Sequence, residues 1–332
     1  MKKHITTNEV IMHTVLEALG KIGIVPVIKI DDEARAVPLA KALIAGGIPC
    51  AEITFRTAQA EEAIRRIRAA VPDILVGAGT VLSIAQVDKA IDAGAQFIVS
   101  PGFNPQVVSH CIERGIPITP GCITPSDLER AVDMGLEAVK FFPAEPAGGL
   151  DYIKAVAAPF PMLTFMPTGG IHGGNIARYL AYEKILACGG SWMATADLIN
   201  HGDFSAITAL CRDAVQHALD FSIVHWGINT EKPEDADRAA DRFSALFGFS
   251  PQAGANSIFA GALLEVMKAK GPGTHGHIAL ATSSLPRAIS YLERQGVRFN
   301  QDSIRRDPQG RVTFIYLQEE IAGFALHLVQ KK

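Results

Sequence analysis

Apolar residues in the first two hundred or so positions fall into two alternating kinds of segment. Short, almost wholly apolar runs predict buried strands at residues 22–30, 50–54, 74–77, 96–99, 116–119, 138–141, 163–166 and 185–188. Between them the apolar residues recur with helical spacing, which predicts helices near residues 8–19, 32–45, 58–70, 84–93, 105–114, 125–134, 150–157, 175–182 and 204–219. Apolar strands that alternate with helices predict an α/β fold, namely a (β/α)8 TIM barrel.

After Asp220 the pattern changes into a repeat. The first copy begins at His225, continues with an amphipathic helix over residues 235–247, and ends in strands around residues 257–259 and 262–267. The second begins at His277, with a helix over residues 285–295 and strands around residues 312–317 and 324–329. Each copy reads βαβββ and neither could bury its apolar face alone, so the pair predicts one smaller α+β domain. The predicted domains are residues 1–221 and 222–332.

The segments that follow the predicted barrel strands share small and polar residues. They read EITFRT at 52–57, GAGT at 77–80, SPG at 100–102, PGCIT at 120–124, KFFP at 140–143, PTGG at 167–170 and GGS at 189–191. In a barrel the carboxyl ends of all strands meet at one rim, where such folds place their active sites. One glycine-rich turn by itself is usually only a loop between a strand and a helix. The whole set of such segments at one rim predicts an active site.

Lys140 is the residue in this set with the most distinctive chemistry. Burial penalises the ammonium form of a lysine, and a neutral amine is the group that forms a Schiff base with a carbonyl substrate. A lysine at a strand end can also extend its charge into solvent. Glu52 is the only carboxylate in its predicted strand. We expect it near the same rim, where it is suited to proton transfer. An ion pair that only holds Lys140 in place is the alternative.

Composition narrows the function without identifying it. The formal net charge is -3 and no long basic run occurs, so a nucleic-acid partner has no electrostatic support. No apolar stretch is long enough to span a bilayer, and the N-terminus lacks the apolar core of a signal peptide. The cysteines are 5 in number and scattered, which indicates reduced thiols in a cytoplasmic protein.

Taken in order, the rim motifs AEITFRT, GAGT, SPG, KFFPAE, PTGGI and GGSW resemble the 2-keto-3-deoxy-6-phosphogluconate and 4-hydroxy-2-oxoglutarate aldolases over roughly residues 10–220. The resemblance implies a class I aldolase on a barrel, a trimer, and no metal cofactor. It implies cleavage of a 2-keto-4-hydroxy acid to pyruvate plus glyceraldehyde 3-phosphate or glyoxylate. Lys140 would form the imine, and Glu52 would be the general acid and base.

The same resemblance implies the substrate contacts. Arg56, Thr80 and Thr168 would bind the pyruvate carboxylate, Pro101 and Phe142 would be steric walls, and Gly169, Gly170, Gly189, Gly190 and Ser191 would hold phosphate through backbone N–H groups. Where many relatives carry a Ser-Pro helix start, this chain continues after PTGGI with His172 and two glycines. We expect the glycines to loosen this turn, so phosphorylated and unphosphorylated substrates both stay open.

Residues 224–330 are similar to the vicinal oxygen chelate superfamily, which includes glyoxalase I, through HWGIN, LLEVM, GHIAL and GFALHL. In metal-dependent members each of four strands offers one ligand, which here implies His225, Glu265, His277 and His327. Imidazole and carboxylate ligands suit Zn, Ni, Fe or Mn. Each histidine alone is more often a hydrogen-bonded strand residue. The alternatives are a ligand-binding, regulatory or oligomerisation module and a separate metal-dependent lyase or isomerase.

Overall fold

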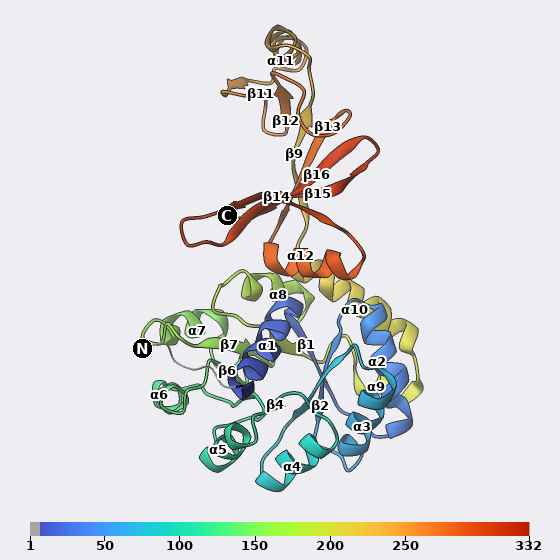
Figure 1. Cartoon of the computed structure of the whole chain (residues 1–332), viewed down its shortest axis with the longest axis vertical. Helices are drawn as coiled ribbons and strands as arrows, with labels where there is room; N and C mark the ends of the chain where they lie inside the picture. The colour runs from blue at the N-terminus through green and yellow to red at the C-terminus, as the bar shows by residue number, and fades with distance from the viewer. Residues whose placement is uncertain (1–6, 332) are drawn as a thin grey trace. The chain divides into compact units, whose positions relative to one another are not determined.

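The computed structural model describes residues 7–331. It consists of two compact units, Met1–Ala218 and Leu219–Lys332. In Figure 1 the first unit runs from blue to yellow and the second from yellow to red. Each unit has its own sheet and its own helices.

The first unit is built on parallel strands. They are β1 (Ile24–Ile28), β2 (Cys50–Thr54), β3 (Leu75–Gly79), β4 (Ile98–Val99), β5 (Ile118–Thr119), β6 (Ala138–Phe141), β7 (Thr164–Pro167) and β8 (Cys188–Gly190). Hydrogen bonding connects six of them in the order β5-β4-β3-β2-β1-β8, and β6 pairs with β7. Parallel bridges Gly121↔Lys140 and Thr168↔Gly189 join the two groups and close the ring. The first unit is therefore the (β/α)8 barrel that the pattern predicts.

The helices of this unit follow the strands in turn and surround them (Figure 1). They are α1 (Thr7–Ile22), α2 (Ala36–Ala45), α3 (Ala60–Ala70), α4 (Ile84–Asp92), α5 (Pro105–Glu113), α6 (Pro125–Asp133), α7 (Gly149–Ala157), α8 (Gly173–Leu180), α9 (Ala196–His201) and α10 (Phe204–Leu219), with a short 3-10 helix at Glu33–Arg35. The strand residues Ile24, Ile28 and Ile53 are buried beneath them.

Two features of the barrel differ from the sequence pattern. The helix α9 has no clear apolar period and was not predicted. The strand β8 lies at Cys188–Gly190 rather than at residues 185–188, because Gly189 and Gly190 pair with Val25 and Pro26 of β1. Two successive glycines indicate a turn in a sequence, whereas here they form the strand that closes the barrel.

The second unit is one mixed sheet of eight strands with two helices. The first copy of the repeat comprises β9 (Ser222–Ile228), α11 (Pro233–Phe247), β10 (Pro251–Ala253), β11 (Ser257–Ala260) and β12 (Leu264–Met267). The second comprises β13 (Gly276–Thr282), α12 (Leu285–Arg294), β14 (Phe299–Arg306), β15 (Val312–Ile321) and β16 (Phe324–Gln330). Both copies therefore have the βαβββ order that the repeat predicts.

Strand pairing shows how the copies are related. Within each copy the first strand pairs in parallel with the last, β9 with β12 and β13 with β16. The first strands β9 and β13 then join the copies antiparallel to each other. Glu265 pairs with Gly227, two residues after His225, and His327 pairs with Ala279, two residues after His277. The four predicted ligands therefore occupy equivalent positions of the two copies.

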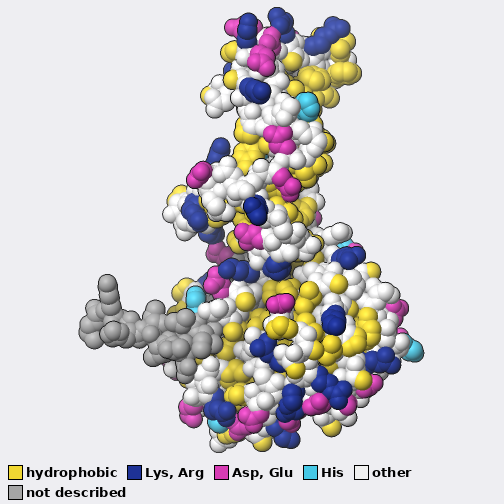
Figure 2. Space-filling view, turned by 45° about the vertical axis from the view of Figure 1, so that its right-hand side comes forward, with side chains coloured by type: hydrophobic (Ala, Val, Ile, Leu, Met, Phe, Trp, Pro, Cys, Tyr) yellow, Lys and Arg dark blue, Asp and Glu magenta, His cyan; other side chains and the backbone are white. Residues whose placement is uncertain are grey.

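The surface charges and the helix lengths are relevant to whether the protein could bind nucleic acid or span a membrane. On the face shown in Figure 2, positive and negative side chains are interspersed, without a basic stripe of the kind that tracks nucleic acid. Within residues 7–331, every helix is too short or too polar to serve as a membrane span.

Candidate active site and a second polar cluster

Lys140 and Glu52 meet inside the barrel. Nζ of Lys140 lies 3.5 Å from Oε1 of Glu52, and the two residues are only 5% and 0% exposed. The backbone of Lys140 is fixed on one side, because its N–H donates to the Pro120 carbonyl and its own carbonyl accepts from Cys122. Either charge alone would be costly to bury, so the pair stabilises both. Neither oxygen of Glu52 has a hydrogen-bond partner among the described residues, which leaves its lone pairs for a ligand or water.

A glycine in the neighbouring strand makes room for this carboxylate. Thr54 of β2 pairs with Gly79 of β3. A Cβ placed on Gly79 would lie 2.1 Å from Oε1 of Glu52, well inside van der Waals contact. The second glycine of the GAGT motif, Gly79, therefore has a structural role, because a larger residue at this position would displace Glu52.

A cavity of about 420 Å³ opens at the rim of the barrel. It is lined by Val27, Lys29, Thr54, Arg56, Phe142, Thr168, Gly169, Gly170, Ile171, Gly190, Ser191, Ala194, Thr195 and Ala196. Alternate residues of a strand point to the same face, so Glu52 lies one layer below Thr54, and Lys140 one layer below Phe142. The ring of Phe142 is 5.5 Å from Nζ of Lys140. Lys140 and Glu52 do not line the cavity themselves, and each precedes a lining residue by two positions, which places the pair deeper in the barrel than the cavity.

Arg56 and two threonines supply polar groups near the cavity. Nε of Arg56 donates to Oγ1 of Thr80 at 3.2 Å. Thr80 has a φ of +58°, which is rare for a β-branched residue and costs on the order of 1–3 kcal/mol. Thr168 is buried, and its Oγ1 has no hydrogen-bond partner in the described part of the chain. A guanidinium and an unsatisfied hydroxyl are groups that bind a carboxylate.

The loops after β6 and β7 are fastened to each other. Ala144 N–H donates to the Thr168 carbonyl at 2.8 Å, and Glu145 N–H donates to the Gly169 carbonyl at 3.0 Å. The hydroxyl of Tyr179 in α8 donates to Glu145. Gly169 and Gly170 have φ values of +98° and +82°, so this turn needs glycine at both positions.

The turn at His172 is better ordered than its glycines suggest. His172 is the N-cap of α8: its Nδ1 accepts from Gly174 N–H at 3.1 Å, and its own N–H donates to Oδ1 of Asn175 at 2.9 Å. Nδ2 of Asn175 also donates to the Gly170 carbonyl. The expectation of a loosened turn is therefore corrected, because these side chains form a capping box that holds it.

The remaining predicted rim residues fall on either side of the cavity boundary. Gly190 and Ser191 line it, whereas Gly189 lies behind Thr168, to which its Cβ would come within 2.3 Å. Pro101 does not line it, and its carbonyl instead packs against Gly121. Lys29 lines the cavity and was not predicted. The signal was the same as for Lys140, a lysine at the carboxyl end of an apolar strand.

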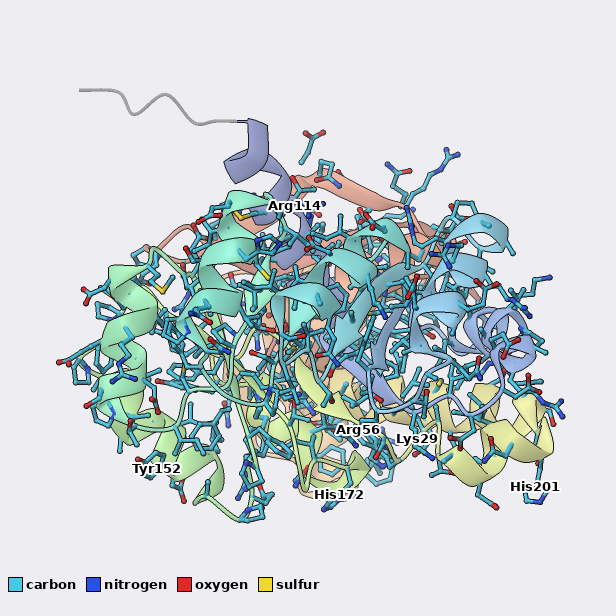
Figure 3. The ribbon with its side chains drawn as sticks, turned by 90° about the horizontal axis from the view of Figure 1, so that it is seen from below. Lys29, Arg56, Arg114, Tyr152, His172 and His201 are labelled. Atoms are coloured by element: carbon cyan, nitrogen blue, oxygen red, sulfur yellow. The ribbon has the colours of Figure 1, made fainter. Side chains whose placement is uncertain are left out.

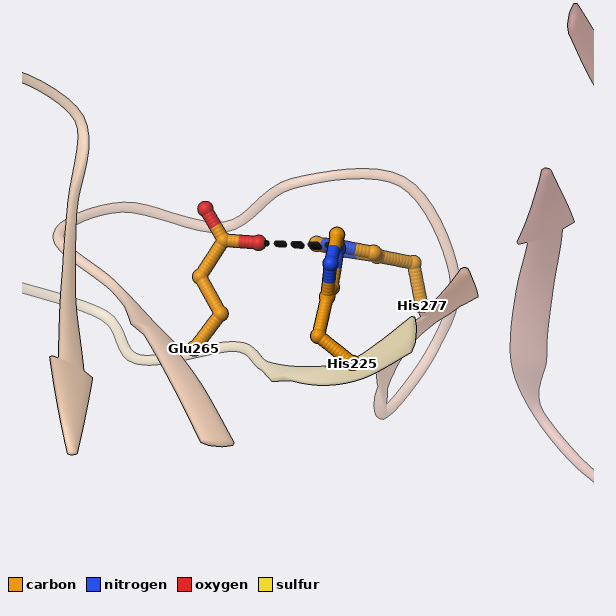
Figure 4. Close-up of side chains that lie close together, drawn as sticks. All are labelled: His225, Glu265 and His277. Atoms are coloured by element: carbon orange, nitrogen blue, oxygen red, sulfur yellow. Dashed lines mark hydrogen bonds and ion pairs between the residues drawn. The ribbon is translucent and has the colours of Figure 1, made fainter. Parts of the chain in front are cut away.

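A second polar cluster lies within the second unit (Figure 4). Nε2 of His225 is 3.1 Å from Nε2 of His277, and Oε2 of Glu265 is 3.2 Å and 3.1 Å from these two nitrogens. Ser257 donates to the other oxygen of Glu265 at 2.6 Å. Three ligands of a tetrahedral zinc, at bonds of ~2.0–2.2 Å, would lie about 3.3–3.6 Å apart. The observed separations of 3.1–3.2 Å are only slightly shorter, so the three residues could hold one metal ion after a small displacement.

The protonation states of this cluster also suit a metal. A hydrogen bond from His277 is the largest effect that lowers the pKa of Glu265 to about 2. Burial lowers the pKa of His225. Near neutral pH these are an ionised carboxylate and a neutral imidazole, the forms that bind metals.

His327, the fourth predicted ligand, is a neighbour of this group and not a member of it. Its ring centroid lies 5.2 Å from that of His277 and 5.4 Å from that of His225. The group whose ligand atoms all lie within 4.8 Å of one another contains His225, Glu265 and His277. His327 instead packs on the ring of Phe314 at 4.5 Å. Burial, followed by the nearby histidines, lowers the pKa of His327 to about 3.

A closed parallel barrel with polar residues at its carboxyl rim is the architecture of a (β/α)8-barrel enzyme. The comparison with protein families agrees. Residues 15–210 match the family described as KDPG and KHG aldolase, and the chain belongs to that family. It is accordingly a lyase.

Similar proteins support this assignment. The chain is 52% identical to the 2-dehydro-3-deoxy-phosphogluconate aldolase of Treponema pallidum over 62% of its own length and 98% of that protein. It is 46% identical to the KHG/KDPG aldolase of Escherichia coli K12, over 59% of this chain and 92% of that one.

Solved structures agree as well. The KDPG aldolase of Legionella pneumophila, with pyruvate captured as a covalent carbinolamine, has a TM-score of 0.58 and 38% identity, over 60% of this chain and 97% of that one. The Zymomonas mobilis ZM4 enzyme, with 3-phosphoglycerate, has a TM-score of 0.56 and 40% identity over 60% and 94%.

Proposed function

We propose that the barrel is a Schiff-base aldolase acting on a 2-keto-4-hydroxy acid, with Lys140 as the imine-forming residue. The observation that carries this proposal is the buried Lys140–Glu52 pair beneath the cavity. After the Lys140 ammonium gives a proton to Glu52, its neutral amine attacks the keto carbon, and loss of water from the carbinolamine leaves an imine. The capture of pyruvate as a carbinolamine by the Legionella pneumophila enzyme supports this chemistry.

Glu52 is the proton carrier of the proposed reaction. Its free oxygen lone pairs lie 3.5 Å from Nζ, so it can take a proton while the carbinolamine forms and return it as water leaves. Removal of the proton from the C4 hydroxyl group then lets the C3–C4 bond break. The electron pair of that bond moves into the imine, which becomes an enamine. The aldehyde departs, C3 of the enamine takes a proton, and water hydrolyses the pyruvate imine to restore Lys140.

The cavity supplies the contacts that orient this substrate. Arg56, held by Thr80, binds the C1 carboxylate together with Thr168, and Phe142 covers the reacting carbons. Gly169, Gly170, Gly190 and Ser191 line the cavity, and their backbone N–H groups would be the donors to a phosphate at the far end of the substrate. We propose 2-keto-3-deoxy-6-phosphogluconate and 4-hydroxy-2-oxoglutarate as the substrates, in line with the names of the relatives.

Borohydride trapping tests the proposed chemistry. The full-length protein is incubated with pyruvate, reduced with sodium borohydride, digested and sequenced by mass spectrometry. We expect a pyruvate-derived adduct on Lys140, and loss of both adduct and aldolase activity in Lys140→Ala. A Lys41→Ala variant, which removes an exposed lysine, is the matched control. An adduct on another lysine, or activity that survives Lys140→Ala, would contradict the mechanism.

We also propose that His225, Glu265 and His277 bind a divalent metal in a glyoxalase-like domain. The convergence of three ligand atoms at 3.1–3.2 Å supports this proposal. Such an ion would supply Lewis-acid stabilisation to an oxygen-chelating substrate. Elemental analysis of the full-length protein after dialysis against Zn, Ni, Fe or Mn tests it. One ion per chain is expected, and a protein that retains none would indicate a ligand-binding, regulatory or oligomerisation module instead.

The oligomeric state is a separate prediction. The family resemblance implies a trimer through the barrel, and light scattering of the full-length protein would measure it. A monomer would contradict the predicted trimer without affecting the chemistry proposed for Lys140.

A further inference from the structure

Lys29 is a second lysine at the carboxyl end of an apolar barrel strand. It follows β1 directly, and both Val27 and Lys29 line the cavity, as residues two apart on one strand face should. Strand β1 lies between β8 and β2, with Pro26 paired to Gly190 and Val27 paired to Glu52. Lys29 is therefore at the rim between the Gly190–Ser191 turn and the strand that leads to Arg56.

The charges in the cavity are all positive. Among the described residues that line it, Lys29 and Arg56 are the charged side chains, and no carboxylate accompanies them. The two are neighbours in Figure 3. A cavity with two separate cations suits a ligand with two anionic groups. Arg56 has its proposed partner in the C1 carboxylate, which leaves Lys29 for the other.

An aspartate outside the cavity holds Lys29 in position. Nζ of Lys29 lies 2.7 Å from Oδ1 of Asp31, and the side chains are 46% and 38% exposed. Oδ2 of Asp31 also accepts from Nδ2 of Asn200 in α9 at 3.3 Å. An exposed ion pair of this kind contributes little to stability. The ammonium has two further N–H donors, so it can turn one toward a ligand without leaving Asp31.

We propose that Lys29 binds the anionic group at the far end of the substrate and thereby selects phosphorylated over unphosphorylated acids. This inference rests on the proposed aldolase function. Backbone N–H groups of the glycine turns offer hydrogen bonds to phosphate but no net charge, and Lys29 supplies that charge. Because a phosphate dianion gains more from an ammonium than a neutral hydroxymethyl group does, the contact discriminates between the two substrates.

Substrate pairs that differ only in the phosphate test this role. The kinetics of full-length wild-type, Lys29→Met and Lys29→Arg protein are measured with 2-keto-3-deoxy-6-phosphogluconate and with 2-keto-3-deoxygluconate. Lys21→Met is the matched control, because Lys21 has the same 2.7 Å ion pair with an acid, Glu17, and does not line the cavity. Inhibition by inorganic phosphate is measured in parallel.

In Lys29→Met we expect the ratio of kcat/KM for the phosphorylated over the unphosphorylated acid to fall by about 10- to 100-fold. The change should appear mainly in KM, weaken phosphate inhibition to a similar extent, and be partly restored in Lys29→Arg. Lys21→Met should keep the wild-type ratio. An unchanged ratio, or equal losses on both substrates, would overturn the role of Lys29.

The failure of this inference can be told apart from the failure of the proposed function. Trapping of pyruvate on Lys140 does not depend on a phosphate, so an adduct in both wild-type and Lys29→Met protein keeps the Schiff-base chemistry whatever the ratio. Absence of the adduct in wild-type protein would remove the proposed function itself and the inference with it.

Discussion

The barrel and the second unit each hold a cluster of ionisable side chains, and the two clusters are built differently. In the barrel the two residues come from β2 and β6, which are not paired with each other, whereas in the second unit they come from the paired strands β12, β9 and β13. In the barrel one ammonium faces one carboxylate at 3.5 Å, and the carboxylate lacks other hydrogen bonds within the described chain. In the second unit two imidazoles and a carboxylate converge to 3.1–3.2 Å, and Ser257 already supports the carboxylate.

The two arrangements suit two different functions, proton transfer in the barrel and metal binding in the second unit. A looser pair with unused lone pairs can exchange protons with a substrate, whereas three converging lone pairs are suited to a shared cation. The surroundings follow the same division. Gly79 lies against Glu52 and Gly189 against Thr168 in the barrel, whereas in the second unit the ring of Phe259 packs against that of His225.

The largest expected effect comes from Glu52→Gln, which tests whether Glu52 transfers protons or only holds Lys140 in place. If Glu52 moves protons, Glu52→Gln lowers kcat by about 10²- to 10⁴-fold, because the amide cannot take up a proton. If it only holds Lys140 in place, the main loss is in thermal stability. Steady-state kinetics and thermal unfolding of the same samples measure both. Glu265→Gln is the matched control and should retain aldolase activity, since it alters the other cluster.

Removal of one metal ligand should produce the next largest effect. We expect His277→Ala to lose at least about 100-fold in metal affinity, and Ser257→Ala about 10- to 100-fold, because outer hydrogen bonds orient the ligands. Competition with a chromogenic chelator measures both affinities. Aldolase activity should not change in either variant. Equal metal binding by wild-type and His277→Ala protein would show that the ion is bound elsewhere.

A smaller effect concerns the space around Glu52. Gly79→Ala places a methyl group 2.1 Å from Oε1 of Glu52, so we expect a loss of about 1–3 kcal/mol in the free energy of unfolding, together with lower kcat. Chemical denaturation and kinetics would show both. Gly102→Ala is the control, because a Cβ there meets nothing within 4 Å and the position is exposed. Similar results for the two variants would argue against a steric requirement at Gly79.

The smallest expected signal comes from the cysteines. All five lie in the described part of the chain and are buried. Burial raises the pKa of Cys111, Cys122 and Cys211 to about 12, so these thiols stay protonated at pH 8. Ellman's reagent should therefore not label the native protein within minutes and should label all five after denaturation. Rapid labelling accompanied by loss of activity would point to a reactive thiol.

Sequence reasoning was strongest where a local pattern carries the information. The barrel follows from apolar strands that alternate with helices, because burial on both faces requires such runs. The βαβββ repeat, and the equivalence of His225 with His277, follow likewise from the sequence. The strand β8 could not be predicted, because Gly189 pairs with Val25, which is distant in the chain. The capping box at His172 is local, but histidine and asparagine differ from the Ser/Thr and Glu/Gln residues that usually mark such a motif.

For the site, the sequence by itself indicated which residues have side chains suited to the proposed chemistry: Lys140 and Glu52 in the barrel, and His225, Glu265, His277 and His327 beyond it. Only the tertiary structure decided which of them meet. In the structure His225, Glu265 and His277 meet, and the ring of His327 lies beside them. Lys29 lines the cavity, whereas Pro101 does not. The physical reason is that residue type and strand period fix the face from which a side chain leaves, whereas the register between strands distant in the chain fixes its neighbours.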